Sequence, residues 1–266
     1  MRDRVLANAE TVSHISKFMS LRGATVVEVG TGWELVSPLV LSLFEPRAIY
    51  TYDHIRHLRP RIVVRVLAQI EVALEEICKI CGLDHAQVST LVSRLSTARS
   101  LPELLAMANI NYIAPGDATA THLPGESVDL YFSYEVFEHL PEDVLLGVIR
   151  ESKRLLKPSG IGFHAIDPGD HYTYAQDGLS RVNFLRYSDR AWDFWVNNKI
   201  SYHNRWRAKQ FMEAFRREGA TFLDVHTETD PCDIKLLKNG FHVAPKFSSL
   251  TPEELAVSYV EIVHRF

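Results

Sequence analysis

Short apolar runs alternate with helical patterns along most of the chain. Residues 26–29 form an apolar run that is followed by Gly30 and Gly32, and residues 33–44 continue with helical periodicity. Apolar runs of this length, bounded by turn residues, are typical of buried strands. Their alternation with helices predicts an α/β fold with a doubly wound, mostly parallel, Rossmann-like sheet. Strands are expected over residues 26–29, 48–52, 111–114, 128–133, 162–166, 220–226 and 258–263.

The helix after the fourth expected strand has the clearest signals. Pro141 suits a first helical position, and apolar side chains then repeat on one face until residues 157–160, Lys-Pro-Ser-Gly, stop the helix. A further helix is expected over residues 207–218. Thr251 and Glu254 form a capping box that opens a short helix before the seventh strand. We expect this last strand to run antiparallel beside the sixth.

Two stretches are too long for ordinary connections. Residues 56–108 form a helical insertion after the second strand, which suits a lid, a substrate-binding lobe or a dimerisation element. Residues 167–207 follow the fifth strand and are rich in aromatic side chains. Such aromatic residues line a pocket or attach a long loop to the protein body, and the sequence leaves both interpretations open. We expect a single domain, residues 1–266, that contains both stretches.

Composition and charge narrow the range of partners. The 266 residues carry a formal net charge of -4, with 46% hydrophobic and 23% charged residues, which disfavours nucleic acid as the main partner. No apolar run has the length of a membrane-spanning helix, and residues 1–10 lack the apolar core of a secretory signal. A cytoplasmic location is therefore expected. Cys78 and Cys81 lack a second ligand pair with zinc-site spacing, which favours packing thiols.

The acid and the glycines of the first turn indicate the kind of ligand. A dinucleotide fingerprint needs a third glycine at position 35, where this chain has Leu35. Glu28 repels a pyrophosphate and favours a cation. Gly30 and Gly32 let the backbone approach a ligand closely. A nucleoside that carries an amino acid and a positive sulfonium therefore fits this turn better than a dinucleotide.

Further motifs follow the next strands in a fixed order. Asp53 comes directly after the second strand, and Gly116, Asp117 and Ala118 follow the third. The fourth strand continues into Glu-Val-Phe-Glu-His-Leu-Pro, residues 135–141. In this order the chain resembles the class I S-adenosylmethionine-dependent methyltransferases over most of its length. The resemblance is carried by residues 28–32, Asp53, residues 116–118, 128–141 and 154–160.

The resemblance implies S-adenosyl-L-methionine as the cofactor. In this reading Glu28 meets the cofactor ammonium directly or through water, Asp53 accepts from both ribose hydroxyls, and Asp117 accepts from the adenine amino group. The family pattern has a glycine where this chain has Glu34, so the exact shape of the turn is expected to differ. The expected cofactor-binding residues are Glu28, Gly30, Thr31, Gly32, Asp53, Asp117, Ala118, Ser133 and Tyr134.

Two histidines near strand ends are candidate catalytic bases. An aliphatic hydroxyl needs a base or a metal to become a nucleophile, because its pKa lies far above 7. His139 is the first candidate, and His171 is the second. Glu135, Glu138 and His139 also resemble the metal-binding E-x-x-E-H motif of small-RNA 2'-O-methyltransferases and ubiquinone-pathway O-methyltransferases. That resemblance implies a divalent metal beside the acceptor oxygen.

The aromatic stretch resembles methyltransferases of bacterial polysaccharide and natural-product pathways. The resemblance rests on residues 179–188, Trp192 and residues 202–207, and it implies a sugar or other polyol hydroxyl as the acceptor. Polar side chains in these segments suit hydroxyl or phosphate groups. The expected substrate contacts are Asn183, His203 and Arg205.

Alternatives remain open from the sequence. N-methylation of a small amine is the alternative reaction, whereas a nicotinamide dehydrogenase or a non-catalytic binding module would use the same fold. The arginine-rich residues 56–65 either attract an acidic substrate or form a solvated, salt-bridged helix face. The leading interpretation is a methyltransferase that acts on a hydroxyl of a small-molecule or carbohydrate-like acceptor. A homo-oligomer is compatible with the sequence.

Overall fold

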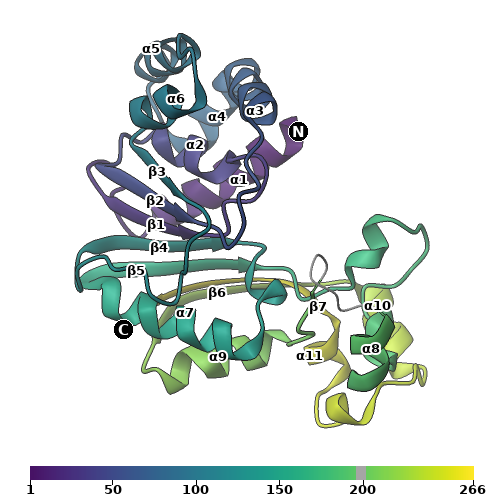
Figure 1. The fold of residues 1–266 in the computed structure, drawn as a ribbon. Helices are drawn as coiled ribbons and strands as arrows, with labels where there is room; N and C mark the ends of the chain where they lie inside the picture. The colour runs from purple at the N-terminus through teal and green to yellow at the C-terminus, as the bar shows by residue number, and fades with distance from the viewer. Residues whose placement is uncertain (196–201) are drawn as a thin grey trace. The chain divides into compact units, whose positions relative to one another are not determined.

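A computed structural model gives the fold of residues 1–195 and 202–266. Its seven-stranded sheet has the order β3-β2-β1-β4-β5-β7-β6 (Figure 1). β1, β2 and β3 pair in parallel, whereas β6 and β7 pair antiparallel. The predicted fold class and the antiparallel last strand are therefore confirmed. The strands are β1 Thr25–Val29, β2 Ala48–Tyr52, β3 Ile110–Ile113, β4 Val128–Tyr134, β5 Leu156–Ile166, β6 Thr221–Thr229 and β7 Val257–Arg265.

The start of β5 differs from the prediction. The strand begins at Leu156, directly after the helix α7 Glu142–Leu155, and so includes the four residues predicted only as a helix stop. A Cβ on Gly160 would lie 2.9 Å from the Val128 carbonyl oxygen. Gly160 therefore lets β5 approach the backbone of β4 more closely than a side chain allows. The residue types Lys-Pro-Ser-Gly are typical of a turn, so the sequence does not predict that the strand begins before them.

The helix α1 falls outside the predicted elements. Its buried residues Val5, Ala9, Val12 and Ile15 repeat with helical spacing, so its amphipathic pattern is present in the sequence. Among the described residues, no helix is both long and apolar enough to cross a membrane. The helices are α1 Arg2–Ser16, α2 Val36–Ser42, α3 Pro60–Val72, α4 Leu74–Cys81, α5 His85–Ser96, α6 Leu101–Met107, α7 Glu142–Leu155, α8 Asp189–Trp195, α9 Ala208–Arg217, α10 Pro231–Lys238 and α11 Pro252–Ala256.

The chain divides into two compact units. Unit 1 comprises residues 1–132 and 151–163, and unit 2 comprises residues 133–150 and 164–266. The predicted aromatic-rich segment, residues 167–207, belongs to unit 2, and its residues 196–201 lie outside the described part of the chain.

Unit 1 contains the predicted helical insertion as α3 to α6. Figure 1 shows these helices grouped with α1, and α3 contacts α1, α4 and α5. Apolar side chains of α3 and α4 form a buried face, whereas Val64 is 62% exposed; the buried residues are Val63, Val66, Leu67, Ile70, Leu74 and Ile77. Cys81 in α4 donates to the Ala9 carbonyl oxygen of α1 (3.4 Å), and burial raises the pKa of its thiol to about 12. Cys81 therefore acts as a packing residue between two helices.

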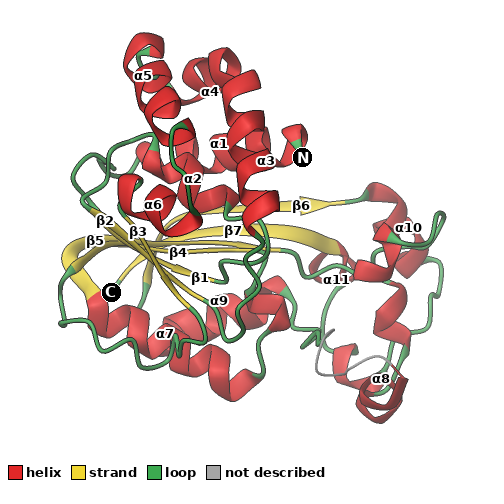
Figure 2. Ribbon diagram, turned by 45° about the horizontal axis from the view of Figure 1, so that its top comes forward, coloured by secondary structure: helices red, strands yellow, loops and turns green. Residues whose placement is uncertain are grey.

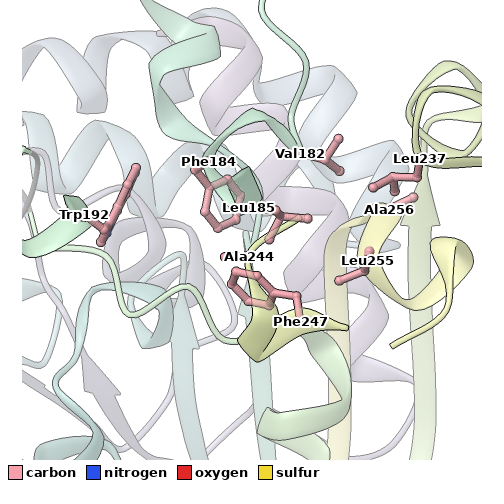
Figure 3. Packing of buried hydrophobic residues seen from close by; sticks show 9 residues of the cluster. All are labelled: Val182, Phe184, Leu185, Trp192, Leu237, Ala244, Phe247, Leu255 and Ala256. Carbon is pink, nitrogen blue, oxygen red and sulfur yellow. The ribbon is translucent and has the colours of Figure 1, made fainter. Parts of the chain in front are cut away.

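Unit 2 combines α9, which contacts β7, with a separate group of short helices. Figure 2 shows α8, α10 and α11 beyond one end of β6 and β7. A cluster of apolar side chains connects this group with the segment after β5 (Figure 3). The capping box of Thr251 and Glu254 forms as predicted at the start of α11. The members of the apolar cluster are Val182, Phe184, Leu185, Trp192, Leu237, Ala244, Phe247, Leu255 and Ala256, all of them buried.

Two fully buried histidines lie on β5 and β7 of unit 2. His164 Nε2 lies 3.2 Å from His264 Nε2, and His164 Nδ1 lies 2.8 Å from the Ser133 hydroxyl. Burial lowers the pKa of His264 to about 3, and burial with the nearby His264 lowers the pKa of His164 well below 6.5. Both rings are therefore neutral in the folded protein at physiological pH.

This pair predicts a specific loss of stability in acid. Below pH 6.5 the unfolded chain binds protons that the folded chain excludes, so the free energy of unfolding falls as the pH falls. Each histidine contributes about 1.4 kcal/mol of this loss between pH 7.5 and 5.5. We expect His264→Phe to reduce the acid-induced loss by about that amount in urea unfolding at the two pH values, whereas the exposed control His242→Phe leaves it unchanged. An equal loss in wild type and His264→Phe would contradict the prediction.

Candidate functional site

The turn after β1 has a backbone conformation that suits glycine. Gly30 and Gly32 have positive φ angles of 88° and 64°, a region in which side chains are strained. The Gly30 amide donates to the Tyr52 carbonyl oxygen (2.8 Å), and the Gly32 amide donates to the Asp53 carboxylate (3.0 Å). Leu35, at the position of the missing third glycine, also has a positive φ, 59°. The backbone is therefore left-handed at this position even though leucine replaces glycine.

Glu28 is a buried acid at the end of β1. The Thr51 hydroxyl donates to its carboxylate. Burial raises the pKa of Glu28 to about 8, although hydrogen bonds involving Thr51 and Ser37 oppose the rise. The side chain is therefore largely protonated at neutral pH, and a cationic group beside it would favour the ionised form. This behaviour suits a residue that binds an ammonium group, but the contact itself stays a prediction.

Asp53 follows β2 in unit 1. Besides the Gly32 amide, its surroundings include His54 Nδ1 and His57 Nε2, which lie 3.2 and 3.9 Å from Asp53 Oδ1. The His57 ring packs on Trp33, with ring centroids 4.7 Å apart. The structure thus brings the glycine turn and Asp53 together. Thr31 is buried in the same turn, and its hydroxyl lies 2.5 Å from the Thr51 hydroxyl.

Asp117 follows β3 and is exposed. Its carboxylate accepts from the Thr119 amide (2.8 Å) and the Thr119 hydroxyl (2.6 Å), so it caps a turn. The Ala118 carbonyl oxygen accepts from the Tyr131 hydroxyl (3.5 Å). The Gly116 amide donates to the Asp53 carbonyl oxygen (2.8 Å), which fixes this loop to the end of β2. The roles of Asp117 and Ala118 toward adenine stay predictions.

The last residues of β4 belong to unit 2. Ser133 is buried and pairs with His164, as described above, whereas Tyr134 is half-buried. Both were expected to contact the cofactor. Both contacts stay predictions. In this structure the Ser133 hydroxyl already has a protein partner, His164.

Glu138 is the most unusual acid of unit 2. It lies in the one-turn helix η1 Phe137–His139, its side chain is fully buried, and neither carboxylate oxygen makes a well-formed hydrogen bond with a described residue. Burial raises its pKa well above the ordinary value, the charges of Asp167 and Glu135 add to the rise, and nearby backbone amides oppose it. Such a carboxyl is neutral unless a cation joins it.

His139 lies beside Glu138 in a defined tautomer. Its Nδ1 lies 2.8 Å from the Tyr202 carbonyl oxygen. Because a carbonyl oxygen only accepts, Nδ1 carries the hydrogen and the neutral ring has its lone pair on Nε2. Nε2 lies 4.0 Å from Glu138 Oε1, and burial lowers the pKa of His139 below 6.5. At pH 7 His139 Nε2 is therefore available as a base or as a metal ligand.

Two further histidines complete a cluster around His139. The ring centroid of His171 lies 4.9 Å from that of His139, and the centroid of His203 lies 5.0 Å from His171 and 6.0 Å from His139. His203 is buried, and its Nδ1 accepts from the Arg205 amide (2.9 Å). The structure thus brings both predicted catalytic histidines together with one predicted substrate contact.

Asp167 supports this cluster but was not proposed as a site residue. Arg181 pairs with its carboxylate, the Tyr174 hydroxyl donates to it, and the Gly169 amide donates at 2.9 Å. Burial alone would raise the pKa of Asp167, but these hydrogen bonds and the charge of Arg181 outweigh burial and lower it. Asp167 is therefore an ionised acid 3.5 Å from His171 Nε2. Its place directly after β5 was the available sequence signal.

The described residues contain two groups of potential metal ligands. Glu138, His139 and His171 offer ligand atoms that lie within 4.8 Å of one another, and so do Asp53, His54 and His57. The sequence prediction named Glu135 together with Glu138 and His139. Glu135 is not in the group, and His171 takes its place. This donor set of one carboxylate and two imidazoles favours Mn²⁺, Fe²⁺, Co²⁺ or Zn²⁺ over Mg²⁺.

The predicted substrate contacts after β5 have protein partners. The Arg205 guanidinium is buried, donates to the carbonyl oxygens of Phe184 (3.2 Å) and Tyr187 (2.6 Å), and pairs with Asp189. It lies 5.1 Å over the ring of Trp192, which is one of the residues labelled in Figure 3. Arg205 therefore holds the loop in place, which supports the second of the two interpretations of this segment.

Asn183 and Arg207 also make hydrogen bonds that fix the segment after β5. The Asn183 amide donates to Asp170 (3.3 Å), and the fully buried Arg207 donates to the carbonyl oxygens of Pro168, Leu255 and Val257. Arg207 thereby fixes the chain next to Asp167. Arg207 was not predicted to have a role, because its burial is not visible in the sequence.

Unit 2 also contains a polar pocket of about 700 Å³. Aromatic side chains, carboxylates and two lysines line it, and the segment Tyr202 to Asn204 passes along it. The same segment holds His139 and Glu138, since Tyr202 bonds His139 and the Asn204 amide donates to the Glu138 carbonyl oxygen (2.8 Å). The lining residues include Glu142, Trp192, Trp206, Lys209, Glu213 and Lys246.

Comparisons with known proteins agree with this fold. Residues 65–163 match the family described as methyltransferase domain, a match that spans α3 to β5 and does not include the glycine turn or Asp53. The search of curated proteins gave no match.

Solved structures match almost the whole chain at low sequence identity. An S-adenosylmethionine-dependent methyltransferase from Mesorhizobium loti has 14% identity and a TM-score of 0.52, with 97% of this chain and 98% of that chain covered. Geranyl diphosphate methyltransferase in complex with S-adenosylmethionine has 14% identity and a TM-score of 0.52, covering 98% and 84%. Phosphoethanolamine N-methyltransferase 2 from Haemonchus contortus has 12% identity and a TM-score of 0.51, covering 97% and 52%. At these identities the similarity establishes the fold. The chain therefore has the fold of S-adenosylmethionine-dependent methyltransferases, and its residues 65–163 match the methyltransferase-domain family.

Proposed function

We propose that the protein transfers a methyl group from S-adenosylmethionine to a hydroxyl of a small-molecule or carbohydrate-like acceptor. The observation that carries the proposal is the cluster of Glu138, His139 and His171 in unit 2. An amine that is already deprotonated needs little help from a base, whereas a hydroxyl does. A neutral histidine beside a buried carboxyl is therefore more useful for O-methylation than for N-methylation.

We assign binding of the cofactor to unit 1. The positive φ angles of Gly30 and Gly32 leave room for close approach of a ligand, and Glu28 gains its charge when a cation lies beside it. Asp53 adds a carboxylate that is already oriented by the Gly32 amide. These features support the assignment of the methionyl group to Glu28 and of the ribose to Asp53.

We assign binding and deprotonation of the acceptor to unit 2. Methyl transfer is an in-line displacement in which the acceptor oxygen attacks the methyl carbon as the carbon–sulfur bond breaks. His139 Nε2 takes the hydroxyl proton, and the hydrogen bond from Nδ1 to Tyr202 keeps the ring in the required tautomer. His171, held beside the ionised Asp167, is the second candidate for this proton.

The same residues also fit a divalent metal. The buried Glu138 carboxylate lacks a well-formed hydrogen bond to a described residue, and a cation would compensate its charge. Glu138, His139 and His171 would hold the ion. A bound divalent metal supplies Lewis-acid stabilisation of the acceptor oxygen. The metal-binding proposal and the base proposal are separable, because only the first requires a chelatable ion.

The polar pocket of unit 2 supports a carbohydrate-like acceptor. Its aromatic side chains suit stacking on a sugar face, and its carboxylates and lysines suit hydroxyl groups. Because Arg205 and Asn183 are occupied by loop contacts, their predicted substrate roles receive no support from these contacts. His203 remains close to the candidate base and is the better of the three proposed contacts.

Replacing His139 tests its role as the base. We expect His139→Gln to lower the rate of methyl transfer to a hydroxyl by about 10²- to 10⁴-fold while S-adenosylhomocysteine binding is unchanged. Transfer of a labelled methyl group to a panel of sugars and polyols measures the rate. In wild type the rate should fall in acid with a midpoint below pH 6.5, because protonation of His139 removes the base and burial lowers its pKa. The exposed control His242→Gln should behave like wild type, and a His139→Gln variant with normal rate and normal pH profile would exclude this role.

Replacing Glu138 tests the metal. We expect wild-type activity to fall after dialysis against a chelator and to return with Mn²⁺ or Zn²⁺. Glu138→Gln should lose both the activity and the metal content, whereas the exposed control Glu228→Gln should retain them. Activity of wild type that is unchanged by the chelator would remove the metal from the proposal and leave His139 as a base.

Replacing Asp53 tests the cofactor assignment. We expect Asp53→Asn to weaken S-adenosylhomocysteine binding by about 1.5–3 kcal/mol, roughly ten- to a hundredfold, because charge-assisted hydrogen bonds to the ribose are lost. Calorimetry measures this change, with the exposed Asp3→Asn as control. Equal affinity of Asp53→Asn and wild type would contradict the assignment.

A further inference from the structure

A groove in unit 1 lies outside the residues assigned to methyl transfer. It is formed by α3, α5 and α6 of the helical insertion, which Figure 1 shows side by side, and its volume is about 610 Å³. Buried side chains of Val63, Leu67, Leu95 and Leu104 line it. Val64, also in the lining, is 62% exposed. Val64 thus extends the apolar lining of the groove to the protein surface.

Positive charge accompanies this apolar groove. Arg61, Arg65 and Arg99 line it, and Glu71 is the acid among the lining residues. Two other arginines of the same sequence run are already engaged, since Arg56 donates to the Ala114 carbonyl oxygen (3.0 Å) and Arg59 lies over Trp33.

The three groove arginines differ from those two. All three are exposed, and none of their guanidinium groups has a hydrogen bond or ion pair with a residue that the structure describes. The salt-bridged helix face considered for this run therefore does not form at Arg61 and Arg65. Three exposed cations beside apolar side chains match a partner with both negative charge and apolar surface.

We infer that this groove binds an anionic amphiphile, a molecule with an alkyl chain and a carboxylate or phosphate head. The alkyl chain of the ligand lies against the valine and leucine side chains, and its head group lies at the arginines. The volume falls within the range of about 300–1,000 Å³ that is typical of small-molecule sites, so a single alkyl chain suits it better than a protein helix. This inference is independent of the proposed acceptor and of the residues assigned to it.

Calorimetry with single-chain probes below their micelle concentrations tests the inference. Dodecanoate and dodecyl phosphate supply the two anionic heads, and dodecyl maltoside supplies the same chain with a neutral head. We expect saturable binding of at least one anionic probe at one site. Across octanoate, decanoate and dodecanoate, affinity should rise about fifteenfold for each two added CH₂ groups, because each buried CH₂ strengthens binding roughly fourfold.

Variants locate the site. The double variant Arg61→Gln, Arg65→Gln should weaken anionic-probe binding by about tenfold or more, and Val64→Asp should weaken it through charge repulsion and loss of apolar surface. Arg150→Gln, an exposed arginine of unit 2, is the matched control and should bind like wild type. S-adenosylhomocysteine binding of every variant should be unchanged, which separates loss of the groove from loss of the fold.

Several results would overturn the inference. They are no binding of either anionic probe, equal binding of dodecyl maltoside, and equal binding of the probes by the double variant and by wild type. Binding of an acidic amphipathic helical peptide in place of the alkyl probes would also overturn it, because the groove would then be a docking surface for protein. If dodecanoate alone or dodecyl phosphate alone binds, the head group of the ligand class is identified as well.

Discussion

The burial of the Glu138 carboxyl is the constraint on which the candidate site depends. A carboxylate removed from water without partners is strongly disfavoured, so Glu138 must be neutral or must share its surroundings with a cation. Asp167, close to it in unit 2, has a lowered pKa instead, because Arg181 and Tyr174 keep its carboxylate ionised. Two acids with opposite pKa shifts beside His139, whose pKa is lowered, are an arrangement that catalytic sites use to separate proton-donating and charge-stabilising roles.

The segment after β5 matters because it brings His171 and His203 to His139. That segment has little regular structure, and two buried arginines hold it. Arg205 and Arg207 donate to backbone carbonyl oxygens of this segment and of the residues packed beside it, which adds hydrogen bonds where regular structure is short. The apolar cluster of Figure 3 packs against the same segment. Arg205, which the sequence assigned to substrate binding, therefore holds the segment that carries His171 and His203.

The sequence predicted what depends on local pattern. The seven strands, the helix after β4, the insertion and the capping box at Thr251 have local sequence patterns and are present, although β5 begins earlier than predicted. It missed what depends on contacts between distant residues. Glu135 belongs to the family-like motif, yet His171, which lies far along the chain, replaces it in the ligand group. Arg205 had the chemistry of a substrate contact, and only its burial reveals the structural role.

Infrared difference spectroscopy of Glu138 tests the central claim most directly. Without a divalent cation, the wild-type protein at neutral pH should show the carbonyl band of a protonated, buried carboxylic acid, and Glu138→Gln should lack that band. Adding Mn²⁺ or Zn²⁺ to wild type should abolish the band as the carboxylate forms. A band that persists at saturating cation, or one that is equally present in Glu138→Gln, would contradict the account of Glu138 as the centre of the site.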